Sequence, residues 1–207
     1  MDNRGDYGGP VAIIGVACRF PGAAEPAEFH DLTVAGQRMF RSAAGALQAA
    51  LLDDWARPEA GMADTGPVQK LAAETTALAL ADAGFRDVAD PWPGAGGLLR
   101  GANGIRHGEG GPLEGGPLRE PGGRGGRAGL SLASSVPGVG SFVREQFGFG
   151  ADLAQWGPPA TSSLHAVAAA AAALSAGELD LAVAGGAELG LDPGWLTAQA
   201  HAGTLGR

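Results

Sequence analysis

The chain has one cysteine, few aromatic residues and no excess of basic residues. A single cysteine, Cys18, excludes an internal disulfide framework and any cysteine-based metal site. With 14 Lys and Arg against 22 Asp and Glu, the formal net charge is −8. This balance argues against nucleic acid and anionic membranes as partners, although an acidic carrier protein could dock on a local basic patch. Because aromatic residues make up only 6%, the core has to be built from Ala, Val, Leu and Ile.

Targeting and membrane-spanning segments are also missing from the sequence. The first ten residues are charged and rich in Gly, without the apolar stretch of a signal peptide. The Ala-rich segment near residue 170 comes closest to the roughly 20 apolar residues of a membrane helix, but Ser175, Gly177 and Glu178 interrupt it. We expect a soluble cytoplasmic protein. Its 207 residues predict one domain, residues 1–207, of a size that buries roughly 70% of its unfolded surface.

Helical and strand patterns alternate along the chain. Apolar runs rich in β-branched residues predict buried strands, and apolar residues three or four positions apart predict helices. We expect strands at 11–15, 97–100, 153–157 and 181–186, and helices at 25–36, 67–84, 138–147 and after the turn at 158–164 as far as Ser175. Such alternation predicts an α/β fold with flanking helices and a mainly parallel or mixed sheet.

Residues 101–128 differ from the rest because Gly and Pro dominate them. Burial cannot offset the entropy of ordering such a composition, so we expect a flexible loop. Its glycines do not form a phosphate-binding pattern, since neither G-x-G-x-x-G after a strand nor G-x-x-x-x-G-K-[ST] occurs.

Several segments resemble the N-terminal half of a β-ketoacyl synthase, specifically the ketosynthase domain of modular polyketide synthases. Residues 11–23 are similar to the opening signature of that family almost letter for letter. Weaker matches follow in the family's order; they are Phe29, Leu32, Ala35, Gly36, Pro67, Gln69, Leu71, Glu74, Leu80, residues 82–84, Phe147, Gly148, residues 177–178, 180–182 and 184–186, Asp192 and Pro193. The resemblance implies a thiolase-like fold, in which two α/β halves form an αβαβα sandwich and the enzymes dimerise. These 207 residues correspond to the first half.

The resemblance places the nucleophile of the family in the turn at 158–164, and this chain departs from the family there. The family reads Asp-Thr-Ala-Cys-Ser-Ser-Ser-Leu. Aligned through Ser162, Ser163 and Leu164, the chain has Gly157 at the Asp position, Pro158 and Pro159 at Thr-Ala, Ala160 at the Cys and Thr161 at the first Ser. A condensing enzyme needs a thiolate to hold the acyl chain as a thioester, and the methyl group of Ala160 cannot do so.

The resemblance also implies that two catalytic histidines and a lysine come from the second half of the fold. That half is not among these residues, so restoring Ala160→Cys alone is not expected to produce a condensing enzyme. One substitute device stays open. His165 lies three or four positions after Ser162 and Thr161, so a Ser–His or Thr–His pair could transfer an acyl group. Alternatively, Ser162 and Ser163 serve as helix-cap and packing residues.

The other candidate groups favour structural roles. We expect His30 to be a partly buried or surface helix residue and His107 to lie in the flexible loop, while His201 matches no motif. Cys18 is expected to be a small buried residue at a strand end. Asp53 and Asp54 have no third ligand nearby in the sequence, so neither a metal nor a cofactor is expected.

Three functional hypotheses remain open. The first is a catalytically silent ketosynthase-like protein that binds a full ketosynthase, an acyl carrier protein or a second copy of itself. The second is an acyltransferase or hydrolase that uses Ser162 or Thr161 with His165. The third is a non-functional remnant of a larger polyketide synthase. No catalytic residue is assigned, and Ala160 marks the degenerate nucleophile position.

Overall fold

The computed structural model of the protein describes residues 10–44, 47–50, 52, 66–85, 128–156, 162–189 and 201. Contacts divide the chain into two compact units. The first comprises Met1–Val16 and Val68–Glu188, and the second comprises Ala17–Pro67 and Leu189–Arg207. The strand expected at 97–100 and residues 101–127 of the expected loop lie outside the described residues.

The first unit contains a three-stranded sheet. Its strands are β3 (Ala128–Ala133), β4 (Ala151–Trp156) and β5 (Leu181–Gly186). They are ordered β4-β3-β5, and β3 pairs in parallel with both neighbours. All six residues of β3 are buried, as expected for a central strand that is covered on both faces.

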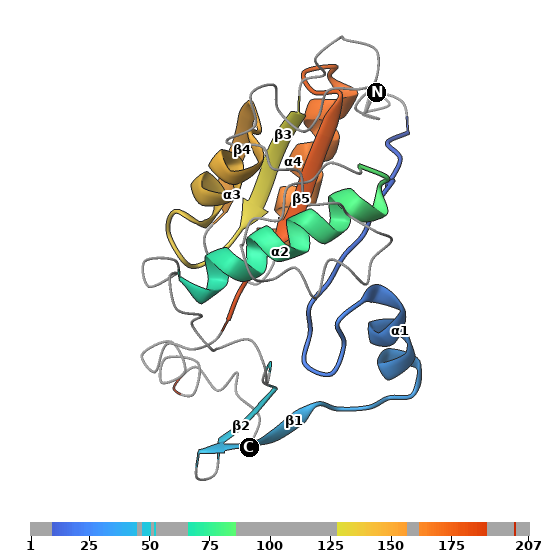
Figure 1. Ribbon diagram of the computed structural model, residues 1–207, viewed down its shortest axis with the longest axis vertical. Coiled ribbons are helices and arrows are strands. Elements are labelled where there is room, and N and C mark those ends of the chain that lie inside the picture. The colour runs from blue at the N-terminus through green and yellow to red at the C-terminus, as the bar shows by residue number, and fades with distance from the viewer. Residues whose placement is uncertain are drawn as a thin grey trace, which may run out of the picture. The chain divides into compact units, whose positions relative to one another are not determined.

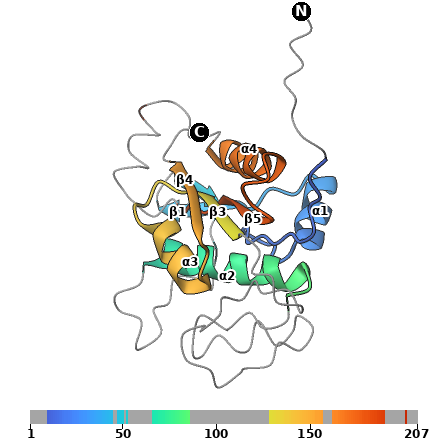
Figure 2. The ribbon, with the colours of Figure 1, turned by 90° about the horizontal axis from the view of Figure 1, so that it is seen from above.

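Helices cover both faces of this sheet. The helix α3 (Val139–Phe147) joins β3 to β4 and packs on these two strands, while α4 (Ser162–Ser175) joins β4 to β5 and packs on all three. Figure 2 shows α3 and α4 on opposite faces (Figure 2). This follows from the right-handedness of parallel crossovers. The chain moves one way from β3 to β4 and the other way to β5, so the two helices lie on opposite faces.

A long helix, α2 (Pro67–Asp82), lies on the same side of the sheet as α3 (Figures 1 and 2). Pro67 stands at its first position, where a missing N–H costs nothing. Its buried residues are Val68, Leu71, Ala72, Ala73, Thr76, Ala77 and Leu80. The helix stops at Gly84, whose φ is +91°. There the N–H of Gly84 donates to the carbonyl of Ala81 and the N–H of Phe85 donates to the carbonyl of Leu80, as in a Schellman motif.

The strand expected at 11–15 is wrong. Residues 11–16 carry no strand pairing, and Ile13 is 82% exposed. The segment instead approaches α2 through Gly15, where an added Cβ would collide with the carbonyl oxygen of Ala79. The N–H of Val16 donates to Asp82 Oδ2 at 2.8 Å. A β-branched run forms a strand only where a sheet edge accepts it, and here the segment is held by a helix.

The second unit contains the helix α1 (Pro26–Val34) and a hairpin of β1 (Phe40–Ala44) and β2 (Leu47–Ala50). The two strands pair antiparallel, and neither was predicted from the sequence. The carboxylate of Glu28 accepts a bond from the N–H of Ala24 at 2.7 Å, which satisfies a donor just before the helix. The rings of Phe20 and Phe29 lie 4.4 Å apart between centroids.

The described elements confirm an α/β arrangement. The helices expected at 25–36, 67–84, 138–147 and up to Ser175 are present as α1, α2, α3 and α4. The strands expected at 153–157 and 181–186 correspond to β4 and β5. The strand β3 was missed, and Ala128 belongs to it rather than to a flexible loop. The small residues Gly129 and Ser131 in β3 gave no apolar strand pattern to detect.

Candidate functional site

A ligand-binding site is expected at the carboxyl edge of the sheet, because the loops that leave adjacent strands there lead to opposite faces. From β3 the chain continues to α3 on one face, and from the adjacent β4 it continues to α4 on the opposite face. Loops that diverge in this way leave a crevice at the carboxyl ends of the strands, where open α/β sheets bind their ligands. Residues 157–161 join β4 to α4. In the sequence, the predicted turn therefore lies between two of the elements that form this switch point.

The first turn of α4 lies close to the end of β5. A Cβ added to Gly186 would come within 3.0 Å of Ser163 Cβ and 3.6 Å of the carbonyl oxygen of Ala133. Glycine at 186 therefore lets the helix N-terminus approach the sheet edge. Ser162 is half-buried and Ser163 is exposed, so a hydroxyl at the start of α4 is open to solvent beside the carboxyl edge.

Two loops at the same edge are tied together. The N–H of Ser135, after β3, donates to Glu188 Oε2 at 2.9 Å. The N–H of Ala187 donates to the carbonyl of Ala133 at 2.9 Å. Neither Glu188 nor Ser135 was predicted from the sequence as a site residue. One feature of the sequence could have indicated Glu188 as a site residue. It follows the apolar strand β5 by two positions, and open α/β sheets bind their ligands at the ends of strands.

The predicted site residues fall into two groups. Ala160 and Thr161, with Pro158 and Pro159, lie outside the described residues. Ser162 and His165 both lie on the first turn of α4, three positions apart, and His165 is exposed. The structure therefore brings a hydroxyl and an imidazole to one end of one helix, which is the minimum for the Ser–His hypothesis.

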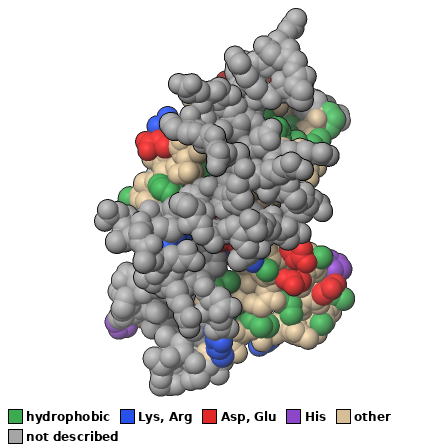
Figure 3. Space-filling view, in the orientation of Figure 1, with side chains coloured by type: hydrophobic (Ala, Val, Ile, Leu, Met, Phe, Trp, Pro, Cys, Tyr) green, Lys and Arg blue, Asp and Glu red, His purple; other side chains and the backbone are tan. Residues whose placement is uncertain are grey.

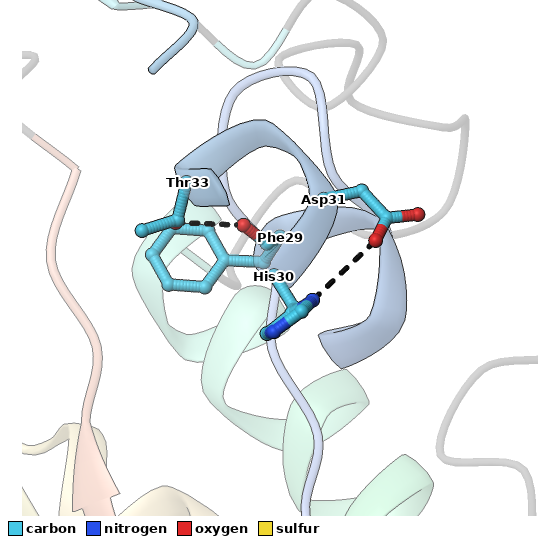
Figure 4. Close-up of polar contacts among 4 residues, drawn as sticks. All are labelled: Phe29, His30, Asp31 and Thr33. Atoms are coloured by element: carbon cyan, nitrogen blue, oxygen red, sulfur yellow. Dashed lines mark hydrogen bonds and ion pairs between the residues drawn. The ribbon is translucent and has the colours of Figure 1, made fainter. Parts of the chain in front are cut away.

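His30 is a surface residue of α1 (Figure 4). Its Nδ1 lies 3.4 Å from Asp31 Oδ1, and the two side chains are 74% and 85% exposed. Such an exposed pair contributes little to stability. In the same helix the hydroxyl of Thr33 donates to the carbonyl of Phe29 at 2.8 Å (Figure 4). The surface around α1 mixes acidic, histidine and hydrophobic side chains (Figure 3).

The other residues considered in the sequence are less informative. His201 is exposed, and His107, Asp53 and Asp54 lie outside the described residues. In the part of the chain that the structure describes, no three His, Cys, Asp or Glu side chains gather in a way that could hold a metal ion. The described helices also include none whose length and hydropathy would allow it to cross a membrane.

Cys18 is partly buried in the second unit. It does not stand at a strand end as expected, because no strand forms at 11–15. Burial raises the pKa of its thiol, Arg19 opposes this effect, and Glu28 and Glu25 add to it. A raised pKa disfavours the reactive thiolate, so this environment does not activate the cysteine.

Comparison with known protein families identifies part of the chain. Residues 138–207 match the model of the N-terminal domain of β-ketoacyl synthases. This part of the chain is similar to the N-terminal domain of β-ketoacyl synthases. No curated protein matches the chain.

The β-ketoacyl synthase match covers α3, β4, α4 and β5. It therefore includes the turn predicted at 158–164 and the strands of the switch point. This match confirms the resemblance to the N-terminal part of a β-ketoacyl synthase that was noted in the sequence. The similarity at 11–23 precedes the matched residues and rests on the sequence pattern alone.

Proposed function

We propose that the chain is a ketosynthase-like protein of polyketide or fatty-acid biosynthesis that does not catalyse condensation and acts by binding. Its partner in this proposal is a ketosynthase or an acyl carrier protein, in the cytoplasm. The proposal includes a thiolase-like arrangement, of which the described sheet and its flanking helices would form part. The observation that carries the proposal is Ala160, a residue with only a methyl group at the family's nucleophile position.

The location of Ala160 in the sequence supports this view. It lies between β4 and α4, within the β-ketoacyl synthase match and next to the switch point of the sheet. A cysteine just before a helix is favoured as a thiolate by the helix dipole, and a thiolate can attack an acyl thioester. An alanine leaves the same scaffold without a group that can take the acyl chain.

Acyl loading tests the catalytic half of the proposal. The variant Cys18→Ala is incubated with an acyl-carrier thioester and its intact mass is measured. We expect no acyl adduct. In the double variant Cys18→Ala/Ala160→Cys we expect an adduct, because the new thiolate attacks the thioester carbonyl and releases the carrier thiol. An adduct on the Cys18→Ala protein would contradict the proposed lack of chemistry.

Binding to a partner tests the other half. Titration of the chain with an acyl carrier protein, and separately with an intact ketosynthase, is followed by calorimetry. We expect saturable binding to one of them, unchanged by Ala160→Ser, since Ala160 has no proposed part in partner contacts. The absence of binding to both would contradict the proposal.

An acyltransferase or hydrolase is the second candidate, because α4 places the half-buried Ser162 and the exposed His165 three positions apart in its first turn. A Ser–His pair can take an acyl group on the serine oxygen while the imidazole accepts its proton. The mass experiment decides between the candidates. An adduct that is present in Cys18→Ala and absent after Ser162→Ala would support this enzyme.

A further inference from the structure

The helix α3 carries an arginine whose charged group is partly inside the protein surface. Arg144 lies in the last turn of α3 and is half-buried. Its Nε atom is closed to solvent and has no hydrogen-bond partner among the described residues. In most surface arginines only the aliphatic stem is buried, and the guanidinium stays in water. At Arg144 the burial extends into the guanidinium, so part of a permanent positive charge has lost its hydration.

Arg144 also lacks a counter-ion in the part of the chain that the structure describes. Its guanidinium makes no ion pair or hydrogen bond there. Carboxylates are not scarce, since the chain has 22 Asp and Glu against 14 Lys and Arg, and Glu145 is exposed at the next position. A partly desolvated charge without a partner costs free energy. A ligand that supplies an anionic acceptor would therefore recover free energy on binding to Arg144.

The local structure of α3 explains how Arg144 is held. Helical side chains lean toward the preceding turn, which here contains Gly140 and Ser141. Gly140 has no side chain, so the stem of Arg144 has room against the helix. At the end of α3 the φ of Gly148 is +69°, and the N–H of Phe149 donates to the Arg144 carbonyl at 3.1 Å. The negative end of the helix dipole favours a cation at this position, but no described carbonyl accepts a bond from Nε.

The last turn of α3 lies away from the candidate functional site. The helix leads from the carboxyl end of β3 to the amino end of β4. After the helix, the N–H of Gly150 donates to the carbonyl of Ala128, at the start of β3, at 3.1 Å. Arg144 is therefore near the amino edge of the sheet, whereas the candidate site is at the carboxyl edge. A ligand at Arg144 would not compete for the switch point.

From this environment we infer that Arg144 is the binding residue for a small oxyanion, a carboxylate or phosphate group. Both groups present two oxygens that match two parallel N–H donors of a guanidinium. Because Nε is closed to solvent, we assign the contact to the Nη end, the part of this half-buried side chain that can reach solvent. The inference is independent of the proposed function, since it requires neither a ketosynthase nor a carrier protein.

Nuclear magnetic resonance of the arginine Nε–H groups tests this inference on the 207-residue protein. The Arg144 signal is the one that disappears in Arg144→Lys, and Arg38→Lys identifies the signal of the exposed Arg38 in the same way. Sodium phosphate, and separately sodium acetate, is added at constant ionic strength and pH. We expect a saturable shift of the Arg144 signal with at least one anion, and the anion that gives it identifies the oxyanion. The Arg38 signal should not show this shift.

Two results of these titrations would overturn the inference. One is the absence of a shift at Arg144 with both anions. The other is a non-saturating shift that Arg144 and Arg38 share, since this would reflect salt alone. Should Arg144→Lys fail to fold, Arg144→Gln supplies the same assignment.

Thermal unfolding in the anion that shifts the Arg144 signal gives a second measurement. We expect the Tm of the parent to rise saturably with the concentration of this anion. Arg144→Lys keeps the charge but loses the planar fork, so half-saturation should require about tenfold more anion, as for the loss of one charge-assisted hydrogen bond. Arg144→Gln should lose the response, and Arg38→Lys should keep it. Equal half-saturation in the parent and in Arg144→Gln would place the bound anion elsewhere and overturn the inference.

Discussion

Ser131 has an unusual environment for a polar residue. It occupies the centre of β3 and is fully buried. Its hydroxyl has no hydrogen-bond partner in the described structure. Burying an unpaired hydroxyl costs free energy, whereas a methyl group in the same place would not.

We therefore expect Ser131→Ala to raise the free energy of unfolding by about 1 kcal/mol. Urea denaturation measures the change. The control is Ser134→Ala, which removes the oxygen that accepts a bond from the N–H of Val136 at 3.1 Å and is expected to be neutral or slightly destabilising. A loss of stability in Ser131→Ala would show that the hydroxyl has a partner after all.

Cys18 permits a second test at the level of one residue. Burial is the main cause of the raised pKa of its thiol, and Glu28 adds to the effect. A raised pKa lowers the fraction of thiolate at any pH below it, so the folded protein should react more slowly with iodoacetamide than the urea-unfolded chain at pH 8. The rate should rise with pH. Glu28→Gln should increase the rate, and Glu145→Gln, on α3, should not.

At the scale of elements, residues 11–16 are the least protected apolar segment described. Val11, Ile13, Ile14 and Val16 are exposed by 42%, 82%, 55% and 52%. Exposed β-branched runs without charge are sites of strand addition and aggregation. We expect Ile13→Lys to lower light scattering during storage at high concentration. Val34→Lys, at an exposed single site on α1, is the control and should change it little.

The attachment of this segment to α2 depends on Gly15. An added Cβ would lie 2.7 Å from the backbone nitrogen of Ala83, and a helix backbone cannot move aside cheaply. We expect Gly15→Ala to displace the segment and break the bond from the Val16 N–H to Asp82. Hydrogen exchange at Val16 should become faster. Gly185→Ala, at a site where a Cβ meets nothing within 4 Å, should leave the exchange at Val16 unchanged.

Local patterns explain which elements the sequence could predict. In α2, Pro67 and Gly84 mark the ends, and in α4 the helix formers run without a break as far as Ser175, so both were found. Strand positions depend on partners far away in the sequence. The run at 11–15 has strand composition without a strand partner in the described part, while β3 has small residues and two partners.

At the scale of the whole molecule, one part of the candidate site could be predicted from local sequence patterns and another part could not. The turn with Ala160 and the Ser162–His165 spacing are local in the sequence and could be predicted. The bond between Ser135 and Glu188 joins positions 53 residues apart. Only the parallel pairing of β3 with β5 brings those positions to one edge, so no local pattern could reveal it.

This bond gives a test of the site as a tertiary unit. We expect Glu188→Ala to accelerate hydrogen exchange at Ser135 and to lower the free energy of unfolding by about 1 kcal/mol. Glu145→Ala removes an exposed carboxylate from α3 and should do neither. Unchanged exchange at Ser135 in Glu188→Ala would mean that the two loops are held together by other contacts.

The central place of β3 has a consequence for biosynthesis. At roughly 5–20 residues per second, a ribosome finishes β3 several seconds before β5, because α3, β4 and α4 lie between them. Throughout that interval one edge of β3 has no partner from its own sheet. The strand-like run at 11–16 has by then already emerged. Chaperone capture of the nascent chain should therefore be strongest after β3 has left the ribosome and before β5 has done so.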